Sequence, residues 1–132
     1  MERSEQDGII TAEQLAQVEI DTGYKTVVWH GLNMTIRPLL TMQEVTQFVD
    51  SVMATCHDKE RDLFFPEMID FAFRVNVVMR YACVKLPEDV DEQYRLVYAT
   101  DLYETIRCKV NQSQLNALWY TISICMNAYT RA

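Results

Sequence analysis

The sequence predicts a mainly α-helical (α+β) protein in which an N-terminal β-hairpin packs against a bundle of four to five helices. Three observations support this fold class. The 132-residue chain has the length of one domain and is 49% apolar, which is enough to build a single core. Two short runs of β-branched and aromatic residues flank Gly31. Apolar residues then recur at helical spacing almost to the C-terminus.

Residues 1–22 are predicted to form an acidic N-terminal arm, ahead of a single helical domain with a β-hairpin over residues 23–132. The arm contains six acidic residues and one basic residue. Thr11 and Gln14 have the spacing of a capping box, so we expect a short helix over roughly residues 12–19. The arm could dock on a neighbouring molecule or remain disordered, and the sequence leaves both open.

The β-hairpin is predicted from two runs, residues 25–29 and 34–37, with a connector that contains Gly31 and Asn33. The connector has the length of a hairpin turn. Pro38 cannot continue as a paired central strand, because proline lacks a backbone N–H. The chain is therefore expected to leave the sheet at Pro38 and to be helical from there onwards.

The first long helix is expected to start after Thr41, which has the capping-box spacing with Glu44. Apolar residues then follow at helical spacing as far as Cys56, so the helix should end near His57. The charged residues 58–62 should form a loop.

The next helix is the most apolar segment of the chain. Pro66 suits its first turn, and Leu86 and Pro87 are expected to stop it. Its apolar residues surround most of its circumference, and such a helix belongs in the middle of a bundle. Residues 66–84 are therefore predicted to form a shielded central helix.

Three further helices are expected in the last third of the chain. A group of acidic residues introduces a short helix through residues 93–99, and Thr100 can cap another over residues 101–109. Asn111 and Gln114 open the last helix. Its apolar stripe consists of Leu115, Leu118, Trp119, Ile122, Cys125, Met126 and Tyr129.

The four cysteines lie at unequal and long intervals, at Cys56, Cys83, Cys108 and Cys125. This spacing, in a chain with ample apolar surface, favours reduced thiols in a cytosol over disulfides. Three of the cysteines are expected within helical apolar stripes. No apolar stretch approaches the ~20 residues that span a bilayer, and acidic residues near the N-terminus are atypical of a secretory signal. We expect an intracellular protein without membrane contact.

No catalytic or cofactor motif is present in the sequence. The three glycines belong to no phosphate-binding loop. Cys56 beside His57 comes closest to a reactive pair, but neighbours on a helix point about 100° apart. A thiol enzyme, or a zinc site completed by a distant cysteine, remains a minor alternative. We predict that the protein is not an enzyme and needs no cofactor or metal.

The formal net charge of −7 disfavours direct nucleic-acid binding, because phosphate contacts require a basic surface. A negative surface can keep a protein soluble, attract a basic partner or imitate a polyanion. The four acids Glu88, Asp89, Asp91 and Glu92 could also bind a hard cation, although this segment lacks the glycine and the terminal glutamate of a calcium loop. Aromatic residues anchor interfaces when they are exposed and belong to the core otherwise. The candidate partner-binding residues are Glu88, Asp89, Asp91, Glu92, Tyr94, Tyr98 and Trp29.

Several short strings between residues 24 and 125 carry a resemblance to known proteins. They include Val28-Trp29-His30-Gly31, Met34-Thr35-Ile36-Arg37, Phe48-Val49-Asp50, Phe65-Pro66-Glu67, Asp70-Phe71-Ala72, Arg80-Tyr81-Ala82, Leu86-Pro87 and Thr100-Asp101. Together they resemble a family of small proteins encoded by phages and prophages of gut Firmicutes, most of which have no assigned function. The resemblance implies a phage origin, and with it a location in the cytoplasm of a bacterial host or in a virion.

These observations predict a non-enzymatic, phage-encoded protein that works by binding another protein. The first expectation is a phage morphogenesis factor for tail or head-tail assembly, which contacts phage structural proteins and copies of itself as a homo-oligomer. The alternative is an anti-CRISPR-type inhibitor of a host defence effector, whose acidic surface blocks the nucleic-acid channel of a CRISPR effector such as Cas9. Carboxylates gathered on one face would favour the inhibitor, and an even scatter would favour the assembly factor.

Overall fold

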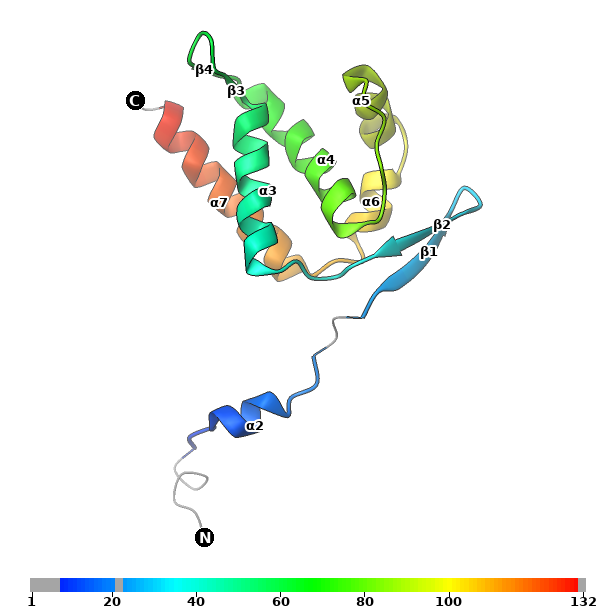
Figure 1. Cartoon of the computed structure of the whole chain (residues 1–132), viewed down its shortest axis with the longest axis vertical. Coiled ribbons are helices and arrows are strands. Elements are labelled where there is room, and N and C mark those ends of the chain that lie inside the picture. Colours follow the sequence, from blue (N-terminus) through cyan, green and yellow to red (C-terminus); the bar gives the residue numbers. More distant parts are fainter. Residues whose placement is uncertain (1–7, 21–22, 131–132) are drawn as a thin grey trace.

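The computed structural model of the chain describes residues 8–20 and 23–130. These residues contain six α-helices, and a two-stranded antiparallel hairpin packs beside them, which confirms the predicted α+β class (Figure 1). Helices α3 to α7 gather in one body, whereas α2 lies apart from it. The elements are α2 (Ala12–Ala16), β1 (Lys25–Trp29), β2 (Leu32–Ile36), α3 (Met42–Thr55), β3 (His57–Asp58), β4 (Leu63–Phe64), a 3₁₀ turn (Pro66–Met68), α4 (Ile69–Tyr81), α5 (Val90–Ala99), α6 (Leu102–Arg107) and α7 (Gln112–Thr130).

Both predicted capping boxes are present. In each, the threonine hydroxyl accepts the backbone N–H of the third helical residue, and that residue's side chain accepts the threonine N–H. The pairs are Thr11 with Gln14 and Thr41 with Glu44. These reciprocal bonds satisfy donors that a helix start leaves unpaired. Helix α2 nevertheless ends at Ala16, earlier than predicted.

Helix α4 is the shielded centre of the bundle, as the sequence predicts. Eight of its thirteen residues are buried, and it packs against α3, α5 and α6. Removal of its apolar side chains from water is the main favourable term in folding. The largest fully buried side chains around it and on it are Tyr81, Phe48, Ile36, Ile106, Leu118, Ile122, Val52, Val77, Val78 and Val97.

Helix α4 ends at Tyr81, so the prediction that it continues to residue 84, to be stopped by Leu86 and Pro87, was wrong. Ala82 adopts an extended conformation and forms an antiparallel bridge with Ile36 of β2. The backbone N–H of Cys83 then donates to a carbonyl of β2 at 2.9 Å. The backbone of residues 82–83 thus forms its hydrogen bonds with the free edge of β2 instead of forming another turn of helix.

Two smaller departures from the predicted elements are local. Helix α6 starts at Leu102, one residue later than predicted, and its N-cap is Asp101 rather than Thr100. The Thr100 hydroxyl still accepts the backbone N–H of Leu102 at 3.2 Å. The helix ends at Arg107, two residues before the predicted end. The predicted charged loop is closed by the short antiparallel pair β3 and β4. A pair this short depends on its neighbours and leaves little pattern in the sequence.

Arg37 ties the end of the hairpin to α3 and α4. Its guanidinium donates to the Glu44 carboxylate and to the Arg80 carbonyl oxygen, the latter at 3.3 Å. The hydrogen bond from Arg37, with a further one from the Thr41 backbone, lowers the pKa of Glu44 to about 2. The carboxylate is therefore ionised in the folded protein at every pH above that value.

This pKa makes stability depend on pH. Because the pKa of Glu44 falls from an ordinary 4.5 to about 2 on folding, the stabilisation is complete above pH 4.5 and is lost as the pH falls toward 2. Glu44→Gln keeps the capping box. It should lower the free energy of unfolding by about 1 kcal/mol at neutral pH, with a much smaller effect near the folded pKa. Urea unfolding at both pH values measures this, and an equal loss at both would contradict the ion-pair assignment.

Candidate protein-binding groove

The predicted aromatic residues do not share one surface. Trp29 lines a groove between the hairpin and the bundle, and Leu96 of α5, which was not predicted, lines it too. Tyr94 and Tyr98 instead contact Phe71 of α4. Residues two apart on a helix point in nearly opposite directions, so Leu96 faces the groove while both tyrosines face away from it.

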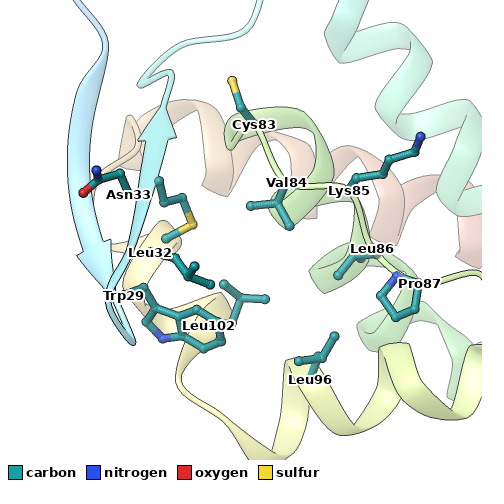
Figure 2. A pocket seen from close by; sticks show the side chains of 11 residues that line it. Trp29, Leu32, Asn33, Cys83, Val84, Lys85, Leu86, Pro87, Leu96 and Leu102 are labelled. Atoms are coloured by element: carbon teal, nitrogen blue, oxygen red, sulfur yellow. The ribbon is translucent and has the colours of Figure 1, made fainter.

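The groove has a volume of about 280 Å³ and lies between the hairpin, the extended segment after α4, and helices α5 and α6 (Figure 2). It forms because the chain leaves α4 at Tyr81 and then runs beside the hairpin. Each of these elements contributes a leucine to the same space, and Figure 2 shows them: Leu32, Leu86, Leu96 and Leu102. The lining consists of Trp29, Leu32, Asn33, Met34, Cys83, Val84, Lys85, Leu86, Pro87, Leu96 and Leu102.

Trp29 forms the hairpin wall of the groove. Its indole Nε1–H donates to Asp101 Oδ1 at 2.7 Å, and His30 packs edge-on with 4.5 Å between ring centroids. Trp29 pairs with Leu32 across a turn in which His30 and Gly31 have φ values of 50° and 76°, as a type I′ turn requires. The indole is thus held in place by the fold, which reduces the entropy cost of binding a partner.

Acidic residues lie beside the groove. Glu88 and Asp89 follow directly on the segment that lines it, and Glu92 lines an adjoining hollow together with Leu96. The four predicted acids at the start of α5 are exposed, and within the described residues none pairs with a basic side chain. Two basic residues are also present, Lys85 in the lining and Arg95 in the adjoining hollow, and the four acids outnumber them. The groove therefore suits an apolar segment flanked by basic residues.

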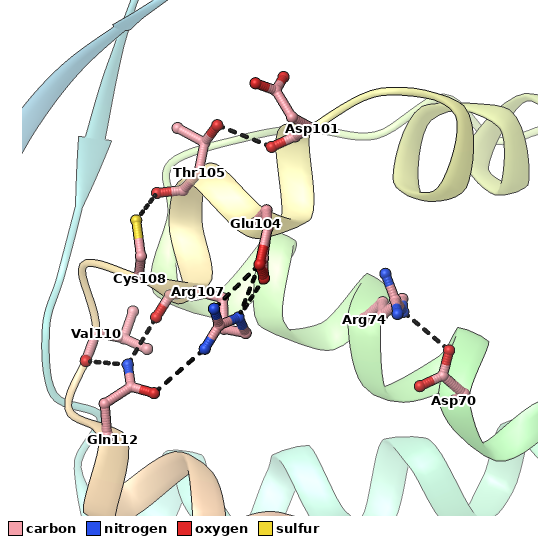
Figure 3. Close-up of polar contacts among 9 residues, drawn as sticks. All are labelled: Asp70, Arg74, Asp101, Glu104, Thr105, Arg107, Cys108, Val110 and Gln112. Carbon is pink, nitrogen blue, oxygen red and sulfur yellow. Dashed lines mark hydrogen bonds and ion pairs between the residues drawn. The ribbon is translucent and has the colours of Figure 1, made fainter.

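Four carboxylates elsewhere in the folded domain are paired with arginines. Figure 3 shows two of these pairs, on α4 and on α6. The hydrogen bond from Arg107 lowers the pKa of Glu104, so this carboxylate stays ionised and paired. Adjacent unpaired carboxylates thus gather at the start of α5. The pairs are Arg37–Glu44, Arg61–Asp58, Arg74–Asp70 and Arg107–Glu104.

Tyr94 and Tyr98 belong to an aromatic cluster on α4 and α5. Their ring centroids are 4.5 Å apart, and the Phe71 ring lies 5.7 Å from Tyr94. The Tyr98 hydroxyl donates to the Asp70 carboxylate, which also accepts from Arg74 Nε at 2.8 Å. Burial raises the pKa of Tyr98. Tyr98 therefore holds α5 to α4, whereas Tyr94, at 53% exposed, remains accessible to a partner.

The predicted residues do not include a second exposed surface, the outer face of α7. The helix has no charged residue from Gln112 to Thr130. Trp119, Tyr120 and Ile124 are nevertheless 40%, 68% and 50% exposed. The outer face of a bundle helix ordinarily carries charged residues, so this long uncharged run was the signal that could have revealed the surface.

Cys56 and His57 do not form an accessible reactive pair. Cys56 is fully buried, and burial raises the pKa of its thiol. His57 Nε2 lies 2.9 Å from Asp62 Oδ1, and its ring stacks on Phe64. Cys83, which was predicted within a helical stripe, lies beyond the end of α4 and is exposed. Among the described residues, no group of three or more His, Cys, Asp or Glu side chains could hold a metal ion.

Comparison with known proteins finds no matching family model, and no curated protein sequence or solved structure matches the chain significantly. None of the helices in the described part of the chain combines the length and the apolar character needed to cross a membrane.

Proposed function

We propose that the protein is a non-enzymatic, phage-encoded assembly factor that captures a segment of a tail or head-tail structural protein in the hairpin groove. The observation that carries the proposal is the groove itself, an apolar hollow of about 280 Å³ with Trp29 fixed in its wall. A contiguous apolar patch that the fold leaves uncovered is typical of a protein interaction site. The phage-like strings in the sequence suggest the class of partner.

The exposed leucine of the hairpin indicates how a partner would gain affinity. Leu32 lines the groove and is 64% exposed. A partner side chain that covered it would remove most of this surface from water, which contributes about 1.5 kcal/mol. Basic residues on either side of that anchor would face the exposed acids Glu88 and Asp89, and such pairs increase association rate and specificity.

The leading test replaces the exposed leucine in the groove. Leu32→Ser should weaken binding of the phage structural protein ~10-fold, which corresponds to the loss of its apolar burial. Val28→Ser is the matched control, because Val28 is 67% exposed on the same hairpin but does not line the groove. Light scattering and titration of the purified chain with tail and head-tail proteins of its phage measure the effect.

Two outcomes would count against this function. A native chain that binds none of the structural proteins would remove the proposed partner class. Equal weakening by Leu32→Ser and Val28→Ser would show that binding occurs but that the hairpin groove is not the site.

A second candidate function is inhibition of a CRISPR effector such as Cas9. It is supported by the exposed, unpaired carboxylates at the start of α5, which could enter a basic nucleic-acid channel. The gathering of these carboxylates favours the inhibitor, whereas the four arginine-paired carboxylates elsewhere favour the assembly role, since paired acids imitate a polyanion poorly. DNA cleavage by several Cas9-type effectors is the test. The triple variant Glu88→Gln, Asp91→Asn, Glu92→Gln keeps the Asp89 cap and should abolish inhibition, whereas undiminished cutting with the native chain excludes it.

A further inference from the structure

We infer that the N-terminal arm of one copy docks between α3 and α7 of a second copy, so that the protein assembles with itself head to tail. This inference deepens the proposed assembly role by naming a second copy as a partner. It rests on surfaces separate from the hairpin groove.

The arm exposes apolar side chains that its own copy leaves uncovered. Five of them are between 57% and 69% exposed, and no residue of α2 is buried. Figure 1 shows α2 apart from the helical body. A helix of five residues is not stable in water by itself, so its capping box prepares a structure that docking would stabilise. The exposed side chains are Ile9, Ile10, Leu15, Val18 and Ile20.

A second groove, between α3 and α7, offers a surface for these side chains. It has a volume of about 470 Å³, and the described residues that line it carry no charge. Met42, at its edge, is the most exposed large apolar residue in the described part of the chain, at 81%. The lining includes Met42 and Val45 from α3, and Ser113, Ala117, Leu118 and Thr121 from α7.

Electrostatics favour the arm as the occupant of this groove. Residues 1–22 carry six acids and one base, and no carboxylate of the lining would repel them. The groove lies beside the first turns of α3 and α7, which both begin at the same end of the helical body (Figure 1). Helix N-termini carry partial positive charge. The hairpin groove is less suitable for the arm, because the unpaired Glu88 and Asp89 lie beside it.

The position of the arm favours docking between copies. Figure 1 shows α2 away from α3 and α7, so the described part of the arm and the groove of one copy both remain open. Docking on the next copy would cover both surfaces. Because the two surfaces differ, the contact is heterologous, and repetition of it builds rings or filaments unless two copies exchange arms.

A complementation experiment tests this inference with two double variants. Leu15→Ser with Val18→Ser removes the apolar contacts of the arm. Met42→Glu with Thr121→Glu places carboxylates in the groove opposite the acidic arm, and Met42→Gln with Thr121→Gln is the control of equal bulk. All four positions are exposed, so circular dichroism and thermal unfolding should report an intact fold in every variant.

The native chain should form an oligomer in size-exclusion chromatography with light scattering, and the glutamine control should retain it. The arm variant and the glutamate variant should each elute alone at the mass of one chain, 15.4 kDa. Mixed in equal amounts, they should form a dimer, because the intact arm of one can dock in the intact groove of the other.

A monomeric native chain, or an oligomer that survives both double variants, would overturn the inference. A mixture that remained monomeric would also overturn it. Binding of phage structural proteins is measured separately, with the arm variant and Leu32→Ser. Loss of self-assembly with partner binding retained would leave the proposed function standing, and the reverse result would leave the self-assembly standing.

Discussion

Replacement of Leu118 by alanine is expected to lower the free energy of unfolding by about 2–5 kcal/mol. Leu118 is 1% exposed and belongs to the core-facing side of α7. Truncation would remove apolar atoms from the core and leave a cavity, and the surrounding helices can relax into it only partly. Guanidinium unfolding followed by circular dichroism measures the loss.

A surface position on the same helix provides the comparison. Asn116 is exposed, and Asn116→Ala should change the free energy of unfolding by no more than about 0.5 kcal/mol. If Leu118→Ala left the denaturation midpoint unchanged, α7 would have to face the core with a different side.

Gln114→Ala should lower the free energy of unfolding by about 2–4 kcal/mol, because it leaves three buried or half-buried polar groups without partners. The Gln114 Oε1 accepts the Leu40 backbone N–H at 2.9 Å and the Tyr81 hydroxyl at 2.7 Å, and its Nε2 donates to the Leu40 carbonyl at 3.0 Å. Tyr81 is 1% exposed, and burial raises its pKa. Its hydroxyl would therefore stay protonated and unsatisfied after the change.

A double-mutant cycle with Tyr81→Phe isolates the hydroxyl's share. Without the Tyr81 hydroxyl, Gln114→Ala leaves one buried polar group fewer without a hydrogen-bond partner. The loss in free energy of unfolding should therefore be about 1 kcal/mol smaller than in the native background. Chemical denaturation of the four proteins gives the coupling free energy. An equal cost in both backgrounds would show that the bond between Tyr81 and Gln114 contributes nothing to stability.

The parts of the fold that depend on neighbouring residues could be predicted from the sequence. The capping boxes at Thr11 and Thr41 and the apolar circumference of α4 are patterns within a few turns of one helix. The end of α4 at Tyr81 could not be predicted in this way. It is decided by the bridge between Ala82 and Ile36, residues far apart in the chain, and no local signal separates that outcome from another helical turn.

The sequence predicts which types of residue belong to the candidate site, but it does not predict how the fold arranges them. Trp29 and the acidic residues at the start of α5 were selected separately, as an exposed aromatic and as a charge cluster, and the fold places them around one groove. Tyr98 was selected by the same reasoning as Tyr94. Its hydrogen bond to Asp70 depends on how α5 packs on α4, which the sequence does not reveal.

The way the arm joins the hairpin has a mechanical consequence for an assembled array. Lys25 follows the arm and pairs with Ile36, which the bridge to Ala82 anchors to the body. Tension on the arm would load this ladder at its open end, where residue pairs part in succession. The hairpin would then peel from Lys25 towards Trp29, and the indole wall would be the last to separate. Strain between neighbouring molecules would thus be absorbed before it disturbed a captured partner.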